Sequence, residues 1–93
     1  MNIKKLYHIR KKIDKLDNRL LDIIKKRTNL VEKVIKIKKL KKQIVDKARI
    51  KKVLRNIKIL SLKKKIDTEI TRKIWISMIN SYIKYEKKNF KKK

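Results

Sequence analysis

The sequence predicts an all-α protein with three helices per chain, and three observations support that fold class. The chain contains no glycine, proline or cysteine, so it lacks the residues that favour tight hairpin turns between strands. Ile, Leu and Val recur at helical spacing along most of the chain. A length of 93 residues leaves room for one small domain, and we expect residues 1–93 to form it.

The first expected helix is long and covers about residues 3–40. Its apolar residues recur at helical spacing, three, four or seven positions apart, from Ile3 to Val34. At about 1.5 Å per residue this helix would be more than about 50 Å long, whereas a compact chain of this size has a radius of gyration of about 12 Å. Because the rest of one chain cannot cover such a stripe, we expect an intertwined helical homodimer.

The second and third expected helices cover about residues 46–60 and 66–89. The apolar pattern is interrupted around residues 41–45 and again near residues 61–65. Asp46 can cap the second helix, and Asp67 with Glu69 places negative charge in the first turn of the third. The apolar residues of the third helix cover a wide arc, which is typical of a helix at the centre of a bundle. Residues 91–93 are expected to form a frayed basic tail.

The composition excludes several kinds of site. Without cysteine the chain has no disulfide, no thiolate metal ligand and no Cys nucleophile, and its one His cannot build a His-rich metal site. Without glycine it has no phosphate-cradling loop. We therefore expect no metal and no cofactor. No apolar run approaches the roughly 20 residues of a membrane span, and no apolar segment of a secretory signal follows the basic N-terminus. We expect a cytoplasmic protein that does not bind membranes.

The net charge of +25, from 33 Lys and Arg against 8 Asp and Glu, is suited to a nucleic-acid binder. Nearly all of these cations are Lys, however, and the other abundant residue is Ile. Both have A/T-rich codons, so a coding bias explains much of the charge. Few aromatic residues are present to stack on bases. A non-catalytic, basic nucleic-acid-binding protein is therefore an alternative, and nucleic-acid binding is not expected to be the main role.

Charged residues occupy apolar positions of the first helix. Arg10, Asp17, Arg27 and Lys38 interrupt a stripe that is otherwise filled by Leu, Ile and Val. Arg is scarce in this chain, and a buried cation is costly unless it meets an anion. That anion is either a carboxylate of the protein or a ligand. Arginines on such a stripe suit a small polyanion, especially a dicarboxylate held by guanidinium groups.

Glu86 is the matching charge on the third helix. It shares one side of that helix with Trp75, Ile79, Tyr82 and Phe90. Glu86 is either a residue at the edge of the bundle that pairs with a neighbouring lysine, or a carboxyl group that desolvation keeps protonated. In the second case it can donate a proton or a hydrogen bond. The sequence leaves both interpretations open.

Several segments resemble the all-helical chorismate mutases of the AroQ class. Arg27 and Lys38 follow Arg10 at that family's spacing. The family's short patterns have counterparts at residues 9–18 (IRKKIDKLDN for IRxxIDxxD), 46–49 (DKAR for DPxR), 66–67 (ID for LD) and 74–79 (IWISMI for IFxxII). Each short pattern alone is weak, but together they extend over nearly the whole chain.

The resemblance implies a domain-swapped dimer of three-helix chains whose active sites use residues from both chains. It implies the Claisen rearrangement of chorismate to prephenate, without a cofactor, in the biosynthesis of phenylalanine and tyrosine. Arg27, with Arg10 of the partner subunit, would bind the two carboxylates of the substrate. Lys38 and Glu86 would hydrogen-bond the ether oxygen, where negative charge grows in the transition state.

The resemblance also implies that Asp46 and Arg49 help to position the ring and the carboxylates, but nearby positions depart from the family. Ile50 stands where a Glu usually contacts the substrate hydroxyl, and Tyr82 stands where a small polar residue is usual. Glu86 replaces a frequent Gln, and as a carboxylate it would repel the developing charge. The segment between Lys38 and Arg49 is one residue shorter than usual and lacks the common Gly and Pro.

Two of these departures resemble a related group of enzymes. Ile50 and Tyr82 look like the residues of isochorismate pyruvate-lyases, which share the fold and eliminate pyruvate to give salicylate. We expect both positions to line the substrate site. An isochorismate pyruvate-lyase is therefore an alternative function, and a weakly active mutase is another.

Overall fold

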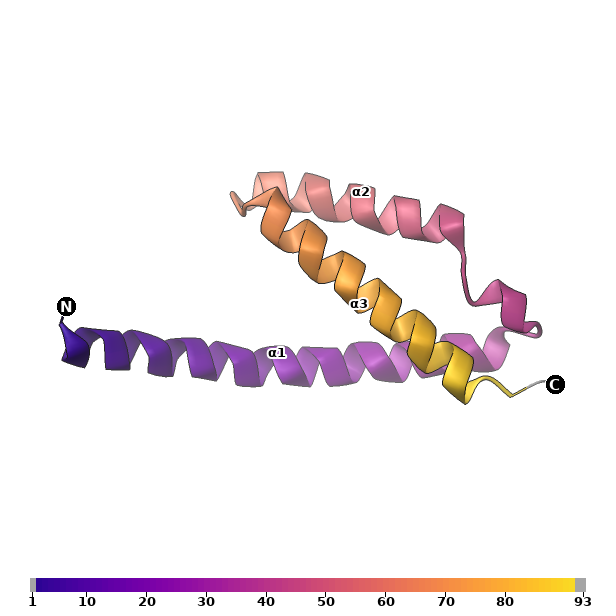
Figure 1. The fold of residues 1–93 in the computed structure, drawn as a ribbon, viewed down its shortest axis with the longest axis horizontal. Helices are drawn as coiled ribbons and strands as arrows, with labels where there is room; N and C mark the ends of the chain where they lie inside the picture. Colours follow the sequence, from indigo (N-terminus) through magenta and orange to yellow (C-terminus); the bar gives the residue numbers. More distant parts are fainter. Residues whose placement is uncertain (1, 92–93) are drawn as a thin grey trace. The chain divides into compact units, whose positions relative to one another are not determined.

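The computed structural model describes residues 2–91, which form α-helices joined by short links. The order is α1 (Ile3–Ile37), a short 3-10 helix η1 (Lys41–Gln43), α2 (Lys47–Lys63) and α3 (Thr68–Asn89) (Figure 1). No strand occurs among residues 2–91, so the expected all-α class is confirmed. Residues 92–93, at the end of the expected basic tail, lie outside the described residues.

The chain divides into two compact units, Met1–Glu32 and Lys33–Lys93. The only element among the described residues of the first unit is α1, so its apolar stripe has nothing within that unit to pack against. The large exposed apolar side chains of the first unit are Ile3, Tyr7, Ile9, Ile13, Leu16, Leu20, Leu21, Ile23 and Leu30. The second unit contains the end of α1, η1, α2 and α3, and its most buried apolar residues are Ile44 and Ile35.

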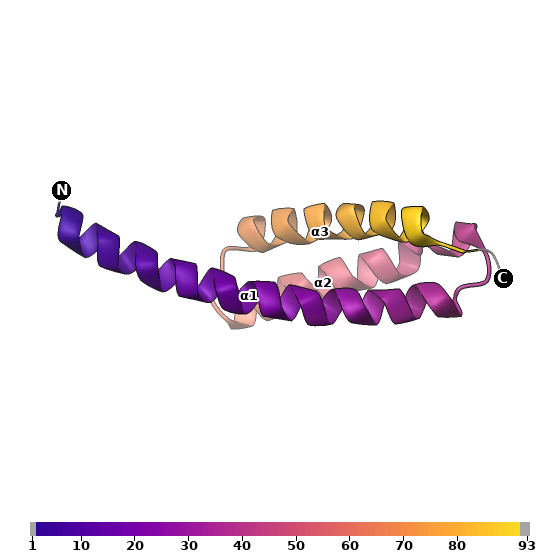
Figure 2. The same ribbon diagram turned by 90° about the horizontal axis from the view of Figure 1, so that it is seen from below.

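In the second unit, α2 and α3 form an antiparallel hairpin (Figure 1, Figure 2). The turn between them has the hydrogen bonds of a Schellman motif: Ile66 N–H donates to Ser61 O over 2.9 Å and Lys65 N–H donates to Leu62 O over 3.2 Å. This motif needs one residue in the left-handed region, usually glycine. Since the chain has no glycine, Lys65 takes that place, with a φ of 57°.

Two buried hydroxyl groups join α2 to α3. Ser61 Oγ donates to Ile57 O over 2.6 Å and lies 2.8 Å from Thr71 Oγ1. Thr71 Oγ1 in turn lies 3.3 Å from Thr68 O, so each hydroxyl has a backbone acceptor on its own helix besides the other hydroxyl. Both side chains are buried. The contact therefore places a satisfied polar pair inside the hairpin rather than at its surface.

The helix ends differ by a few residues from the expected ranges. α1 ends at Ile37 rather than near residue 40, and α2 continues to Lys63 rather than ending near residue 60. The predicted caps are confirmed. The Asp46 carboxylate accepts a hydrogen bond from Arg49 N–H over 3.0 Å at the start of α2, and the Asp67 carboxylate accepts one from Glu69 N–H over 2.8 Å at the start of α3.

Candidate functional site

An ion pair joins the end of α1 to the last part of α3. Lys38 directly follows α1, and its Nζ atom lies 3.6 Å from Oε1 of Glu86. Glu86 is buried, with 8% of its surface exposed, whereas Lys38 is half-buried. The cation that pairs with Glu86 is thus one of the three that interrupt the apolar stripe expected for the first helix. Glu86 therefore pairs with a lysine that is distant in sequence and not with one of its neighbours on α3.

A second contact holds the Lys38 side chain from the other direction. Its Nζ atom donates to the carbonyl oxygen of Ile44 over 3.4 Å. Ile44 is 3% exposed, so its carbonyl belongs to a residue anchored in the core of the second unit. The ammonium group therefore lies between a side-chain carboxylate and a backbone carbonyl.

The first turn of α2 lies close to Lys38. Lys38, Gln43, Val45, Asp46 and Lys47 line one open hollow. Asp46 and Lys47 belong to the N-terminal end of α2, where the free N–H groups and the helix dipole favour negative charge. The hollow presents the Lys47 ammonium, the Lys38 ammonium that pairs with Glu86, and the Asp46 carboxylate that caps the helix.

The other candidate positions of the second unit lie on α2 and α3. Arg49 and Ile50 are in the first turn of α2, with Arg49 exposed and Ile50 half-buried. Tyr82 is half-buried one turn before Glu86 on α3. The structure thus brings Lys38, Glu86 and Asp46 into one unit with these three residues.

Arg10 and Arg27 lie in the first unit. Arg10 is exposed and Arg27 is half-buried, both on α1. Seventeen residues separate them, which is about 25 Å along a helix. One chain therefore holds these two guanidinium groups too far apart for both to contact the same small molecule.

A comparison with family models identifies the family to which the chain belongs. The model described as chorismate mutase type II matches residues 9–87. This match includes every candidate residue from Arg10 to Glu86. The chain belongs to the chorismate mutase type II family. Chorismate mutases are isomerases, so membership supports an isomerase that acts on chorismate. Searches of curated proteins and of solved structures gave no match.

Two features near the site are not singled out by the apolar pattern. Gln43 lines the hollow of Lys38 and its side chain hydrogen-bonds the backbone of the link after α1. The only signal for Gln43 in the sequence is its position three residues after Leu40, the N-cap of η1. A glutamine at that distance from an N-cap is part of the capping-box pattern. Ile44 fills the core beneath this link, within a segment where the sequence predicts only a break between helices.

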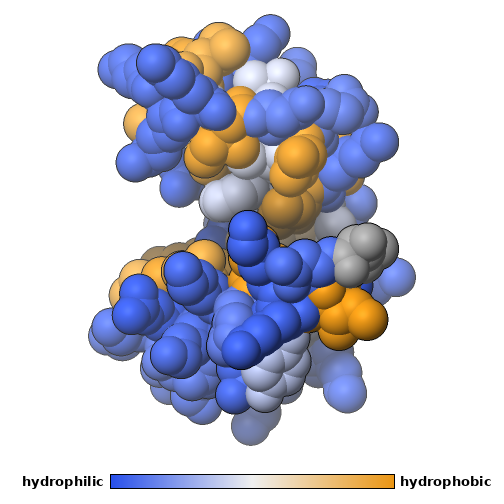
Figure 3. Space-filling model, turned by 90° about the vertical axis from the view of Figure 1, so that its left-hand side faces the viewer, coloured by the Kyte–Doolittle hydropathy of each residue, from blue (hydrophilic) through white to orange (hydrophobic). Residues whose placement is uncertain are grey.

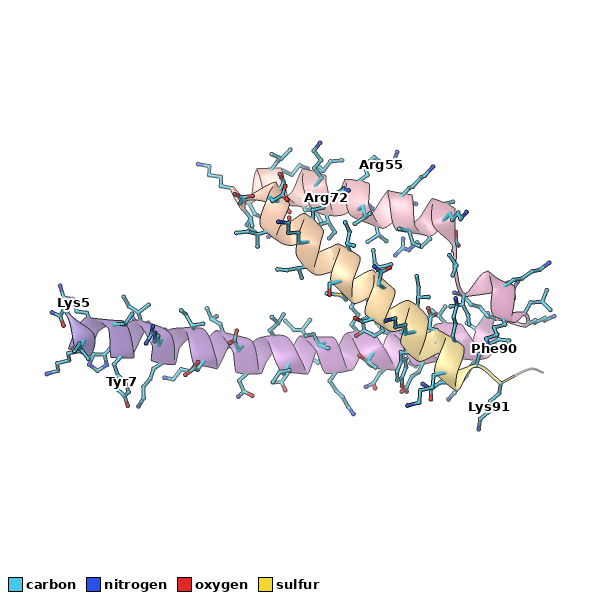
Figure 4. All side chains as sticks on the ribbon, viewed as in Figure 1. Lys5, Tyr7, Arg55, Arg72, Phe90 and Lys91 are labelled. Atoms are coloured by element: carbon cyan, nitrogen blue, oxygen red, sulfur yellow. The ribbon has the colours of Figure 1, made fainter. Side chains whose placement is uncertain are left out.

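A second hollow lies between α2 and α3, away from the candidate site residues. Arg55 of α2 and Arg72 of α3 line it from the two helices (Figure 4). Both arginines are exposed, so they occupy ordinary polar positions of the helical pattern. No group of three or more potential metal ligands occurs among the residues described. No described helix is both long enough and apolar enough to cross a membrane.

Proposed function

We propose that this chain is a chorismate mutase that rearranges chorismate to prephenate in the biosynthesis of phenylalanine and tyrosine. The observation that carries the proposal is the position of Lys38 beside the buried Glu86, in a chain whose residues 9–87 match the family. The reaction is unimolecular: the ether C–O bond breaks as a new C–C bond forms. No proton or electron enters the overall balance, and the protein provides binding and electrostatic stabilisation.

Lys38 and Glu86 would stabilise the breaking bond. Negative charge grows on the ether oxygen only as the transition state is approached, so a donor aimed at that oxygen lowers the barrier more than it strengthens substrate binding. The Lys38 ammonium is such a donor. Glu86 can donate only as the neutral acid, because its carboxylate has no proton to give and would repel the developing charge. The proposed role of Glu86 as a donor therefore requires a neutral carboxyl group in place of the ion pair with Lys38.

Arg27 and Arg10 of the partner subunit would bind the two carboxylates of the substrate. Guanidinium groups bind carboxylates through two parallel hydrogen bonds and so fix their orientation. Holding both carboxylates would keep chorismate in the compact chair from which the rearrangement proceeds. The separation of about 25 Å along α1 supports taking the two arginines from different chains.

An intertwined, domain-swapped homodimer would provide that second arginine. Large apolar side chains along α1 are exposed, among them Ile13, Leu16 and Leu20. Apolar surface also lies open between polar side chains on the face in Figure 3. An exposed apolar stripe of this length supports burial against a second copy of the chain, because apolar surface of this extent is rarely left in water.

Asp46 and Arg49 would help to position the ring and carboxylates from the start of α2. Their neighbour Ile50 supports a second candidate function, an isochorismate pyruvate-lyase that gives salicylate and pyruvate. Ile50 is half-buried and offers no hydrogen bond to a substrate hydroxyl, and Tyr82 places an aromatic ring where a small polar residue is usual. Both changes would reshape the pocket around the substrate ring.

Replacing Lys38 tests the proposed function. We expect Lys38→Met, which keeps an apolar chain of similar length without the cation, to lower the rate of prephenate formation by about 100-fold or more. Lys36→Met is the matched control, because Lys36 is exposed in the last turn of α1. Its rate should remain close to that of the wild type. Equal rates for Lys38→Met and wild type would contradict the proposed role of this residue.

A further inference from the structure

We propose that Gln43 is a positioning residue that holds the Lys38 ammonium at its place in the site, an inference that rests on the proposed function. Gln43 lines the same hollow as Lys38 and Asp46. It is the last residue of η1. The residues that carry the resemblance to chorismate mutases do not include it.

The Gln43 side chain ties together the backbone directly after Lys38. Its Oε1 atom accepts hydrogen bonds from Lys39 N–H over 2.9 Å and from Leu40 N–H over 2.8 Å. Gln43 N–H in turn donates to Leu40 O over 3.0 Å. One side-chain oxygen thus satisfies two backbone donors and closes the turn that leads away from α1.

This turn determines where Ile44 and its carbonyl lie. Ile44 N–H donates to Lys41 O over 3.1 Å, which completes the 3-10 turn, and the Ile44 side chain is buried. The Ile44 carbonyl then accepts the hydrogen bond of Lys38 Nζ. Gln43 is therefore connected to the ammonium group at both ends of the link, through the backbone next to Lys38 and through the carbonyl that Lys38 contacts.

The composition of the link between α1 and α2 explains why a side chain, and not the backbone alone, stabilises this turn. The segment from Lys38 to Asp46 contains neither Gly nor Pro, so no residue pre-forms the turn through its backbone preferences. These two hydrogen bonds use only the acceptor oxygen of the Gln43 side chain, since both of its partners are backbone N–H groups. A glutamate at position 43 would keep that acceptor, whereas a leucine of similar size would remove it.

Steady-state kinetics with two substitutions test the inference. We expect Gln43→Leu to lower kcat for prephenate formation by about tenfold, with a smaller change in KM, because Lys38 acts mainly in the transition state. Gln43→Glu should restore kcat to within about twofold of the wild type. Lys42→Gln is the matched control from the same turn, since Lys42 is exposed, and it should leave both constants unchanged.

Lysine acylation provides a readout that does not depend on catalysis. Wild type and variants are treated briefly with an acetylating reagent, and the labelling of Lys38 relative to Lys42 is measured by mass spectrometry. Burial and the contact with Glu86 should make Lys38 react slowly in the wild type and in Gln43→Glu. In Gln43→Leu the relative labelling of Lys38 should rise several-fold. Unchanged labelling together with unchanged kcat in Gln43→Leu would overturn the inference.

The two readouts separate this inference from the proposed function. If the wild type forms no prephenate but Gln43→Leu exposes Lys38 to acylation, the proposed function fails and the positioning of Lys38 by Gln43 stands. If Gln43→Leu does not fold, as judged by circular dichroism, Gln43→Asn replaces it. Its oxygen lies one methylene closer to the backbone, so it should fail to bond both N–H groups and should give the same rise in Lys38 labelling. A wild-type labelling pattern in a folded Gln43→Asn would overturn the inference.

Discussion

The Nζ atom of Lys38 lies 3.6 Å from Oε1 of Glu86, and this contact joins the end of α1 to α3. Glu86 is buried and Lys38 also bonds the carbonyl of Ile44. The pair therefore places an ammonium group and a carboxyl group at one point of the fold. If Glu86 carries a proton, both side chains can donate a hydrogen bond to a substrate. If it does not, Lys38 is the donor and Glu86 is an anion.

The rate of the proposed reaction should consequently depend on pH. Only protonated Glu86 donates to the ether oxygen, and the protonated fraction of a carboxyl group falls as pH rises. Prephenate formation by the wild type should therefore slow with rising pH. Glu86→Gln keeps an N–H donor at every pH, so its profile should be flat. A wild-type rate that does not change with pH would exclude protonated Glu86 as the donor.

Loss of Arg27 should abolish most of the activity. Arg27→Ala removes the proposed partner of one substrate carboxylate, and we expect kcat/KM to fall by about 100-fold or more. Arg19→Ala is the control, because Arg19 is an exposed arginine on the same helix. Steady-state assays of both variants measure the effect. The proposed role of Arg27 is wrong if the two variants lose activity to the same extent.

The apolar stripe of α1 should be covered by a second chain. Light scattering at a protein concentration of about 10 μM should give twice the chain mass. Leu20→Glu places a charge on the stripe and should shift the mass towards that of a monomer. Lys15→Glu also adds negative charge to α1, at an exposed position that the stripe does not include, and should leave the dimer intact. A folded wild-type monomer would refute the domain-swapped architecture.

The Ser61–Thr71 contact should stabilise the α2–α3 hairpin. Ser61→Ala removes the 2.8 Å contact between the two hydroxyls and leaves Thr71 only its 3.3 Å contact with Thr68 O, so we expect a loss of about 1 kcal/mol in the free energy of unfolding. The double variant with Thr71→Val removes both hydroxyls and should cost less than the sum of the single changes. Urea titrations at one protein concentration measure these energies.

Ser81→Ala is the control for that series. Ser81 Oγ donates to Ser77 O over 2.8 Å in the same manner as Ser61 donates to Ile57, but Ser81 is exposed. Water can replace its hydrogen bond, so the change in the free energy of unfolding should remain within about 0.5 kcal/mol. A loss as large as that of Ser61→Ala would mean that the buried pair has no special contribution.

Local sequence signals predicted much of the fold. The capping carboxylates Asp46 and Asp67 occupy the predicted helix starts, because an N-cap depends on a side chain and a backbone N–H only two or three residues away. The helix C-termini were harder to predict. α1 ends at Ile37, and Gln43 Oε1 then accepts hydrogen bonds from Lys39 N–H and Leu40 N–H in place of helical carbonyls, whereas α2 continues to Lys63 until Lys65 provides the left-handed turn. Neither residue type is a usual stop signal.

The candidate site could be predicted only in part. A charge on an apolar stripe singled out Lys38, and the apolar surroundings of Glu86 singled out that residue. Their pairing was not predictable, because a chain with 33 Lys and Arg offers Glu86 many cations, and sequence spacing does not rank contacts between distant helices. The role of Gln43 was missed for a similar reason: an exposed glutamine in a link has no pattern that separates it from its neighbours.

The most direct test of the proposed function is to identify the products. Purified protein is incubated separately with chorismate and with isochorismate, and the products are separated by chromatography. We expect prephenate from chorismate, at a rate that Lys38→Met reduces strongly. Salicylate and pyruvate from isochorismate, with no prephenate from chorismate, would contradict it and would assign the specificity to Ile50 and Tyr82.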